Sequence, residues 1–233
     1  MSANHAAFNL IFRFVENYIS PIAGRISSQR HVMAIRDGFI SAMPFMIVGS
    51  FLLVFAYPPF SPDTTWGFAR AWLDLAKEFE GRILTPFDMT MGIMSIYICA
   101  AISYNLGKHY EKSNQLDPFM CAMLSIMAFL LIAAPKTNGT LPVDSLGGTG
   151  IFTAILVAIY CVEMMRFLKA HNIGIRLPDQ VPPMIKNSFD LLIPVLVVVL
   201  TLYPLSLFIQ HHFDMLIPQA IMAIFKPLVS AAD

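Results

Sequence analysis

The chain has 233 residues, of which 57% are hydrophobic and only 13% are charged, and its mean hydropathy is +0.65. Soluble domains carry about 25% charged residues, so this composition excludes an ordinary soluble protein and indicates an integral membrane protein. The 15 Lys and Arg residues equal the 15 Asp and Glu residues in number, and no basic excess therefore suggests nucleic acid as a partner.

The N-terminal segment is amphipathic. Residues 3–19 place apolar side chains at helical spacing, with Arg13 and Glu16 on the opposite side, which predicts a helix lying in the membrane interface. A soluble helix packed on the protein's own cytoplasmic loops is the alternative. Ser20 before Pro21 is typical of a helix cap and a first turn, so a second short helix is expected there. The first residues lack the pattern of a cleavable signal peptide, and the first span is expected to direct insertion.

Five apolar runs predict transmembrane helices. They are Gly38 to Tyr57, Met89 to Leu106, Phe119 to Ala134, Ile151 to Val162, and Leu191 to Gln210. The last run contains no charged residue over 20 positions, and as a helix it covers about 30 Å, close to the thickness of the hydrocarbon core of a bilayer.

Prolines predict bends in one of the expected helices, and tryptophans predict an interfacial position for another. In the fifth span, which Pro182 and Pro183 precede, Pro194 and Pro204 each remove a backbone donor, so a bend is expected at both. The segment that ends at Asp88 carries both tryptophans of the chain on one helical side, which favours an interfacial helix. The tail from residue 215 to 229 is too short and too broken to count as a sixth span.

Small residues recur at helical spacing in two of the spans. Such stripes allow a second helix to approach closely. The stripes are Ser95, Cys99, Ser103 and Gly107 in the second span, and Gly150, Ala154 and Ala158 in the fourth. The three cysteines, Cys99, Cys121 and Cys161, lie in apolar runs, and we interpret them as packing residues without a disulfide or metal role. We interpret Asn138-Gly139 as a turn rather than as part of a glycosylation site.

The distribution of Lys and Arg predicts the orientation. The N-terminal 37 residues, the link between spans two and three, and the link between spans four and five together hold ten of the 15 cations, and the other face holds five. The positive-inside bias then predicts a cytoplasmic N-terminus and, with five spans, a C-terminus outside the cell.

No catalytic constellation is present in the sequence. There is no phosphate-binding glycine loop, serine elbow or metal-ligand spacing. We therefore expect no catalytic residue, no metal ligand and no cofactor. His211 and His212 are adjacent, so on a helix their side chains diverge by about 100° and cannot chelate one ion together. Four residues at the inner end of span two remain candidates for a polar pocket or, alternatively, for a polar helix end with a snorkelling lysine. They are Tyr104, Asn105, Lys108 and His109.

An ordered set of short motifs between Leu146 and Val195 resembles a known transporter family. The motifs are Leu146-Gly147 with Gly150 and Phe152, Glu163 with Arg166, Leu177-Pro178-Asp179, Val181-Pro182-Pro183, and Ser188-Phe189 with Leu192-Ile193-Pro194. Upstream, Arg36-Asp37-Gly38, Met43-Pro44 and Gly49-Ser50 fit the same pattern. The chain is similar over nearly its whole length to the N-terminal half of the membrane IIC component of the phosphoenolpyruvate-dependent sugar phosphotransferase system, lactose/cellobiose/diacetylchitobiose family.

The resemblance implies a function. It implies a multi-pass protein of the inner membrane, all-α with about five transmembrane helices and interfacial amphipathic helices. Residues 1–233 would form a single membrane domain, the scaffold part of a IIC permease, with residues 1–37 as its cytoplasmic amphipathic segment. The family's IIC proteins are homodimers that carry a disaccharide such as cellobiose or diacetylchitobiose inward for phosphorylation by IIB, which is charged by IIA.

This chain matches only the first part of that family. The family's sugar-binding histidine and glutamate belong to later elements, so no sugar-contacting residue is assigned, and we expect a truncated chain that does not transport by itself. The alternatives are a membrane scaffold or assembly partner without transport, and an unrelated small permease.

Overall fold

The computed structural model describes residues 20–135, 139–175, 178, 180 and 182–230. The regular elements in this part of the chain are α-helices and one short 3-10 turn, which confirms the all-α prediction. The helix expected over residues 3–19 lies outside the described residues. The elements are α2 (Ser20–Ser27), α3 (Arg30–Ala56), α4 (Gly67–Asp88), α5 (Met94–Asn114), α6 (Pro118–Ala133), η2 (Gly148–Gly150), α7 (Ile151–Ala170), α8 (Pro183–Asp190), α9 (Leu192–Phe213) and α10 (Ile217–Ser230).

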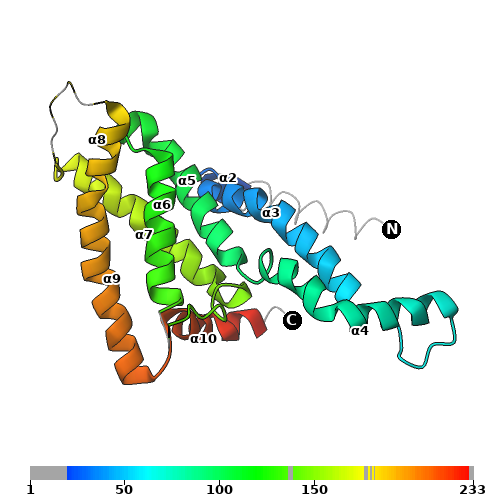
Figure 1. Cartoon of the computed structure of the whole chain (residues 1–233). Coiled ribbons are helices and arrows are strands. Elements are labelled where there is room, and N and C mark those ends of the chain that lie inside the picture. The colour runs from blue at the N-terminus through cyan, green and yellow to red at the C-terminus, as the bar shows by residue number, and fades with distance from the viewer. Residues whose placement is uncertain (1–19, 136–138, 176–177, 179, 181, 231–233) are drawn as a thin grey trace, which may run out of the picture.

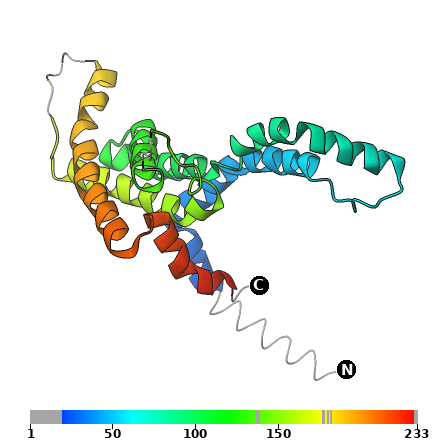
Figure 2. The same ribbon diagram turned by 60° about the horizontal axis from the view of Figure 1, so that its bottom comes forward.

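The long helices α3, α5, α6, α7 and α9 run between the two ends of the molecule in alternating directions (Figure 1). One end carries α8 with the C-terminal ends of α5 and α7, and the opposite end carries α4 and α10. Figure 2 shows that α4 and the second half of α3 lie side by side as an arm that projects from the remaining helices. Neighbours joined by short links therefore pack antiparallel, as expected for a polytopic helical protein.

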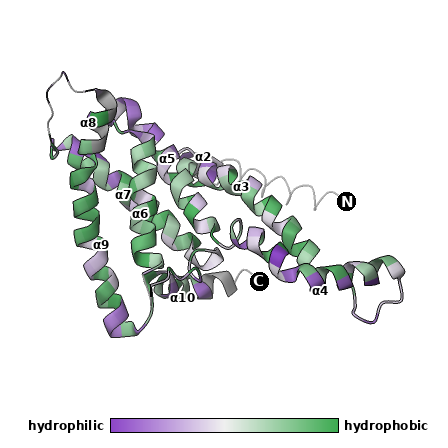
Figure 3. Ribbon diagram, in the orientation of Figure 1, coloured by the Kyte–Doolittle hydropathy of each residue, from purple (hydrophilic) through white to green (hydrophobic). Residues whose placement is uncertain are grey.

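The apolar surface is distributed as in a membrane protein. The helix α3, the segment Gly148–Ala170 and the helix α9 are each long and apolar enough to cross a membrane, and α6 is a shorter apolar helix of 16 residues. Large apolar side chains on α3 and α9 are exposed, among them Phe51 and Leu200. Figure 3 shows green, hydrophobic residues along α6 and α9, whereas α4 alternates between hydrophobic and hydrophilic positions. The predicted interfacial helix before Asp88 thus corresponds to α4.

The helix α5 lies at the centre of the bundle, where α3, α6 and α7 pack on it. Its small-residue stripe is buried, as predicted: Ser95, Cys99 and Ser103 are fully inaccessible, and Gly107 is buried. A Cβ atom on Gly107 would lie 3.0 Å from Pro118 Cα at the start of α6. The second stripe, on η2 and α7, is buried as well, and the three cysteines are free and buried.

The second predicted span begins too early. Residues 89–93 form turns rather than the first helical turn, and α5 starts at Met94. The loop between α6 and η2 closes on this start: the amide of Ser95 donates to the Leu146 carbonyl over 2.9 Å, and its hydroxyl donates to the Gly147 carbonyl. An apolar run does not distinguish such a buried turn from a helix. At the other end α5 continues to Asn114 and α7 continues to Ala170, beyond the predicted limits.

The predicted fifth span, Leu191 to Gln210, is confirmed as one helix, α9, and a separate short helix, α8, precedes it. The chain ends α8 at Asp190 and begins α9 at Leu192. A continuous helix would require the amide of residue 194 to donate to the Asp190 carbonyl, and Pro194 has no amide hydrogen. In the observed arrangement Pro194 lies in the first turn of α9, where no intrahelical acceptor is needed. The interruption thus lies at Leu191, before α9, and not at Pro194 inside the span as expected, whereas Pro204 does lie inside the helix.

The tail forms α10, a 14-residue helix that packs near the start of α7. The rings of Phe225 and Phe152 stack there with centroids 4.4 Å apart. The prediction that this tail is not a sixth span agrees with the length of α10 and with its position across the end of the bundle (Figure 1).

The contact between α3 and α5 gives a stability prediction. A Cβ atom on Gly38 would lie 2.4 Å from Ile102 Cγ1 and 2.9 Å from the Ile102 backbone nitrogen, and the backbone of α5 cannot yield as a flexible side chain would. We expect Gly38→Ala to cost about 1–3 kcal/mol from overpacking, measured as thermal unfolding in detergent. The control is Gly81→Ala on α4, where nothing lies within 4 Å of the added atom. An unchanged melting temperature for Gly38→Ala would show that the two helices can separate freely.

Candidate functional site

A polar junction, defined here as Gln29, His31, Tyr110, Glu163 and Arg166, joins the start of α3 to the ends of α5 and α7. The Glu163 carboxylate is its centre. Its Oε1 atom lies 2.8 Å from His31 Nε2 and 2.8 Å from the Tyr110 hydroxyl, and its Oε2 atom lies 2.7 Å from Arg166 Nη2. A single carboxylate thus receives hydrogen bonds from three helices.

The cap of α3 orients His31. Gln29 Oε1 accepts from the amide of Val32, 3.4 Å away, as the N-cap of the helix. The Gln29 Nε2 group therefore faces His31 Nδ1, at 2.9 Å, and donates to it. With Nδ1 accepting, His31 carries its hydrogen on Nε2 and donates to Glu163. The helix start, the histidine and the carboxylate form one continuous chain of hydrogen bonds.

Tyr110 is buried under this junction, with 2% of its surface exposed. It lies one turn beyond Leu106, on the polar last turns of α5. Burial, together with the hydrogen bond to Glu163, raises the pKa of Tyr110 above its ordinary value. The hydroxyl therefore stays protonated and donates to Glu163 across the neutral pH range.

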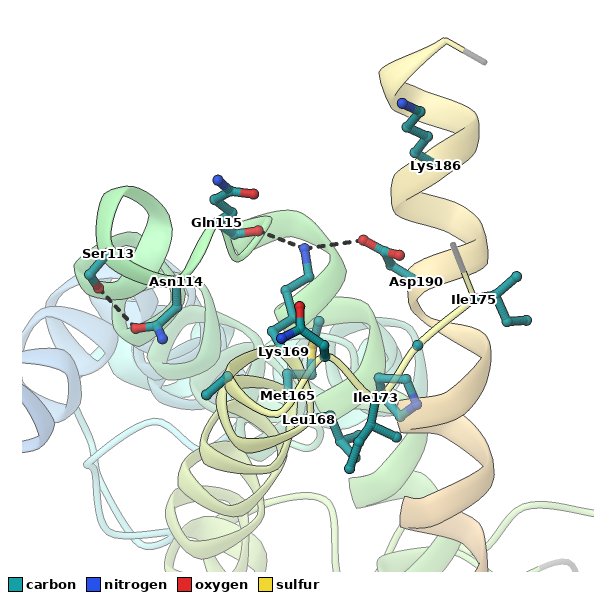
Figure 4. Close-up of a pocket in the computed structure, with 14 residues that line it drawn as sticks. Ser113, Asn114, Gln115, Met165, Leu168, Lys169, Ile173, Ile175, Lys186 and Asp190 are labelled. Atoms are coloured by element: carbon teal, nitrogen blue, oxygen red, sulfur yellow. Dashed lines mark hydrogen bonds and ion pairs between the residues drawn. The ribbon is translucent and has the colours of Figure 1, made fainter. Parts of the chain in front are cut away.

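A pocket of about 630 Å³ opens beside the junction, at the same end of the bundle (Figure 4). Its walls come from the ends of α5 and α7, from residues 172–175 and from the α8–α9 elbow. Lys169 crosses it: the Nζ atom donates to the Gln115 carbonyl over 2.7 Å and lies 3.2 Å from Asp190 Oδ2. Gln115 ends α5 in the left-handed conformation, with φ of 53°, so the lysine is placed at the negative end of that helix.

The volume of this pocket falls in the range of small-molecule sites. Lys169 and Asp190 are directed at each other across it (Figure 4), so the pocket's central charges hold the α8–α9 elbow against the bundle. We interpret the Lys169 contacts as structural ties.

The polar residues predicted at the inner end of span two do not form a common pocket. Asn105 Nδ2 donates to the Ala101 carbonyl within its own helix, over 2.9 Å. Tyr104 is 41% exposed, and Lys108 Nζ lies 5.4 Å from the centre of its ring. The alternative of a polar helix end with a snorkelling lysine describes them better. His109 is not among the residues that line the described pockets.

His211 and His212 stand at the last turn of α9, with ring centroids 5.2 Å apart and ring planes at 82°. His212 Nδ1 faces the Phe208 carbonyl. Over the described residues, no group of three His, Cys, Asp or Glu side chains could hold a metal ion.

The sequence pattern does not reveal the junction as a unit. It singled out Glu163 and Arg166, which are three residues apart on one helix, but His31 and Tyr110 reach Glu163 from 132 and 53 positions away. A charged residue directly after an apolar span was the available signal, and it does not identify a partner on another helix.

These features define a helical multi-pass membrane protein with a polar junction at one end. The family model described as "Phosphotransferase system, EIIC" matches residues 36–231. The chain therefore belongs to the EIIC family of the phosphotransferase system, which confirms the resemblance found in the sequence.

Related proteins agree with this assignment. The chain is 35% identical over 206 residues to the cellobiose-specific EIIC component of Geobacillus stearothermophilus, covering 80% of this chain and 43% of that protein. It is 33% identical over 219 residues to the lactose-specific EIICB component of Streptococcus mutans, covering 91% of this chain and 37% of that protein.

A solved structure is similar as well. The crystal structure of ChbC, the IIC component of the N,N'-diacetylchitobiose-specific system, matches with a TM-score of 0.77 and 31% identity, covering 94% of this chain and 52% of ChbC. The chain thus spans about half the length of ChbC and less than half of the two curated relatives.

The junction gives a second stability prediction. We expect Glu163→Gln to destabilise the protein by about 1–3 kcal/mol, because His31, Tyr110 and Arg166 lose their shared charged acceptor. The control is Asp37→Asn, which breaks the exposed pair that Asp37 forms with the adjacent Arg36 and should cost at most about 1 kcal/mol. Chemical denaturation of both variants in detergent measures the difference. Equal effects would contradict the central role of Glu163.

Proposed function

We propose that this chain forms the scaffold part of a IIC permease that carries a β-glucoside disaccharide, such as cellobiose or diacetylchitobiose, across the cell membrane. The observation that carries the proposal is the similarity to ChbC over 94% of the chain. The cellobiose-specific relative supports the same substrate class. As partners we propose IIB, which phosphorylates the incoming sugar at the cytoplasmic face, and IIA, which supplies IIB with the phosphoryl group.

The scaffold role is supported by what the described residues contain. Sugar recognition requires several converging polar groups in an enclosed site. Of two pockets that the described residues line, one is open and its central charges pair with each other, and the other is an apolar groove on α3. We infer that sugar binding needs elements beyond the residues that the structure describes. The whole chain then acts as a single membrane domain, with residues 1–37 as its cytoplasmic segment.

We propose a cytoplasmic N-terminus and a C-terminus outside. The alternation of helix directions supports this orientation, because it puts eight described cations at the end that carries the polar junction. They are Arg25, Arg30, Arg36, Lys108, Lys112, Arg166, Lys169 and Lys186. That cation-rich end is the cytoplasmic one under the positive-inside bias.

We also propose a homodimer, with the exposed face of α3 as the contact. Ile40, Met43, Ile47, Val54 and Tyr57 follow one another at intervals of three, four, seven and three residues and are about half exposed. Such a seam fits a neighbouring helix by knobs-into-holes packing. A groove of about 410 Å³ opens on the same face. The projecting α3–α4 arm also favours the second candidate function, a membrane scaffold or assembly partner without transport.

Fusion reporters test the orientation. A reporter that requires the cytoplasm should be active after Lys112 and after Lys169, and silent after Asn138 and after Asp233. A reporter that requires the outside should give the opposite pattern, which serves as the internal control. The reverse result for all four positions would overturn the proposed topology.

Transport assays test the function. Vesicles that contain this chain as the sole IIC polypeptide, with IIA, IIB and a phosphoryl donor, should accumulate no sugar phosphate from labelled cellobiose or diacetylchitobiose. A chimera in which residues 36–231 replace the matching segment of the Geobacillus cellobiose component should restore cellobiose phosphorylation, because the scaffold then holds a complete binding part. A well-folded chimera without activity would favour the non-transporting scaffold, and uptake by the chain without the chimera would reveal a sugar site in it.

A further inference from the structure

Two arginines on different helices share one aromatic ring at the cation-rich end. Arg30, the first residue of α3, has its guanidinium carbon 5.5 Å from the centre of the Tyr110 ring. Arg166 on α7 lies 4.9 Å from the same ring centre. Guanidinium groups bind to aromatic faces in this way, through cation–π attraction and planar stacking. The buried tyrosine therefore holds two guanidinium groups within 5.5 Å of one ring centre.

The two arginines differ in their acidic partners. Arg166 pairs with Glu163 over 2.7 Å, whereas Arg30 makes no ion pair with any described residue. The Arg30 guanidinium carries five N–H donors, and those that do not face Tyr110 are available to a ligand. Arg30 is also exposed.

The neighbouring carboxylates do not neutralise this end. Asp37, Glu163 and Asp190 are engaged in ion pairs, and Asp117 caps α6. Glu111, next to Tyr110, is exposed. These five acids face the eight cations named above, so the described part of this end carries an excess of positive charge.

The depth of the site indicates the ligand. The apolar part of α5 ends at Leu106 and that of α7 ends at Val162, each about one turn before Tyr110 and Arg166. One helical turn is about 5.4 Å, so the two guanidinium groups lie just outside the hydrocarbon core, at the level of lipid phosphates. Arginine is suited to this level because its stem packs on apolar surface while its head remains in the polar region.

We propose that Arg30 and Arg166, held on Tyr110, bind the phosphate of an anionic phospholipid headgroup. Phosphate oxygens only accept hydrogen bonds, and guanidinium groups bind them in a charge-assisted, bidentate manner. A lipid phosphate is already concentrated at this depth, which favours it over inorganic phosphate from solution. Basic sites between membrane helices are a common form of anionic lipid recognition. The bound lipid would bridge α3 and α7 at the polar junction.

The test is a lipid titration of the full-length protein in mild detergent. Thermal unfolding is followed by the emission of the two tryptophans, Trp66 and Trp72, which lie on the arm away from the site. Phosphatidylglycerol should raise the melting temperature in a saturable way, and phosphatidylcholine should not. Arg30→Gln should require about fivefold more phosphatidylglycerol for the same shift, as expected for one arginine near an anionic surface.

Arg82→Gln is the matched control, because Arg82 also stacks on an aromatic ring, that of Phe79 at 5.6 Å, but lies on α4. It should leave the titration unchanged. Equal shifts with both lipids, or an Arg30→Gln titration identical to wild type, would overturn the proposal. Full stabilisation by millimolar inorganic phosphate would overturn the assignment to a lipid.

A second measurement does not depend on a variant that folds. Mass spectrometry of the wild-type protein should show co-purified phosphatidylglycerol that is lost as the salt concentration rises, because salt screens exposed charges. Retention of phosphatidylglycerol and phosphatidylcholine in equal proportion at all salt concentrations would contradict a charged site.

Discussion

The close approach of three helices to α5 is the constraint on which the rest of the structure depends. In a bilayer the hydrophobic effect does not drive helices together, because lipid tails are as apolar as leucine, so association relies on tight van der Waals contact. Gly38 and Gly107 allow α3 and α6 to approach α5 at backbone distance, and Ser95, Cys99 and Ser103 present little side-chain volume to their neighbours. The Ser103 hydroxyl donates to the Cys99 carbonyl of its own helix, so the tight face leaves that donor satisfied.

This packing determines which polar groups meet at the cation-rich end. With α3, α5 and α7 fixed against one another, polar residues that flank their apolar segments converge, and Glu163 becomes the shared acceptor of His31, Tyr110 and Arg166. The same geometry places Arg30 over the Tyr110 ring. The Lys169 contacts then hold the elbow before α9 to the same end. Helix packing in the apolar interior thus determines how polar groups are arranged at the cation-rich end. In the proposed function, this end faces lipid headgroups and IIB.

Membership of the EIIC family gives a role to surfaces that have no partner in the single chain. The apolar seam of α3 and the projecting arm are unfavourable in water, but both fit the proposed scaffold, which would lie in lipid and contact a second subunit. The polar junction and the apolar seam lie on different parts of the molecule, so the proposed contact with a second copy and the proposed contact with headgroups are compatible with each other.

The sequence by itself determined the membrane class, the positions of the main helices and the family. Uncharged runs such as Leu191–Gln210 have few alternatives to a membrane helix, since backbone groups in hydrocarbon must be satisfied internally. It also identified the small-residue stripes, because their spacing follows the helical period. The sequence-based prediction failed where the local backbone conformation depends on contacts with neighbouring segments. The turn at residues 89–93 is held by the loop at Leu146, and Pro194, where a bend inside the span was expected, lies instead in the first turn of α9. Only the tertiary structure joined His31 to Glu163 and both arginines to Tyr110, because contacts between residues 132 positions apart are set by helix packing and leave no periodic trace in the sequence.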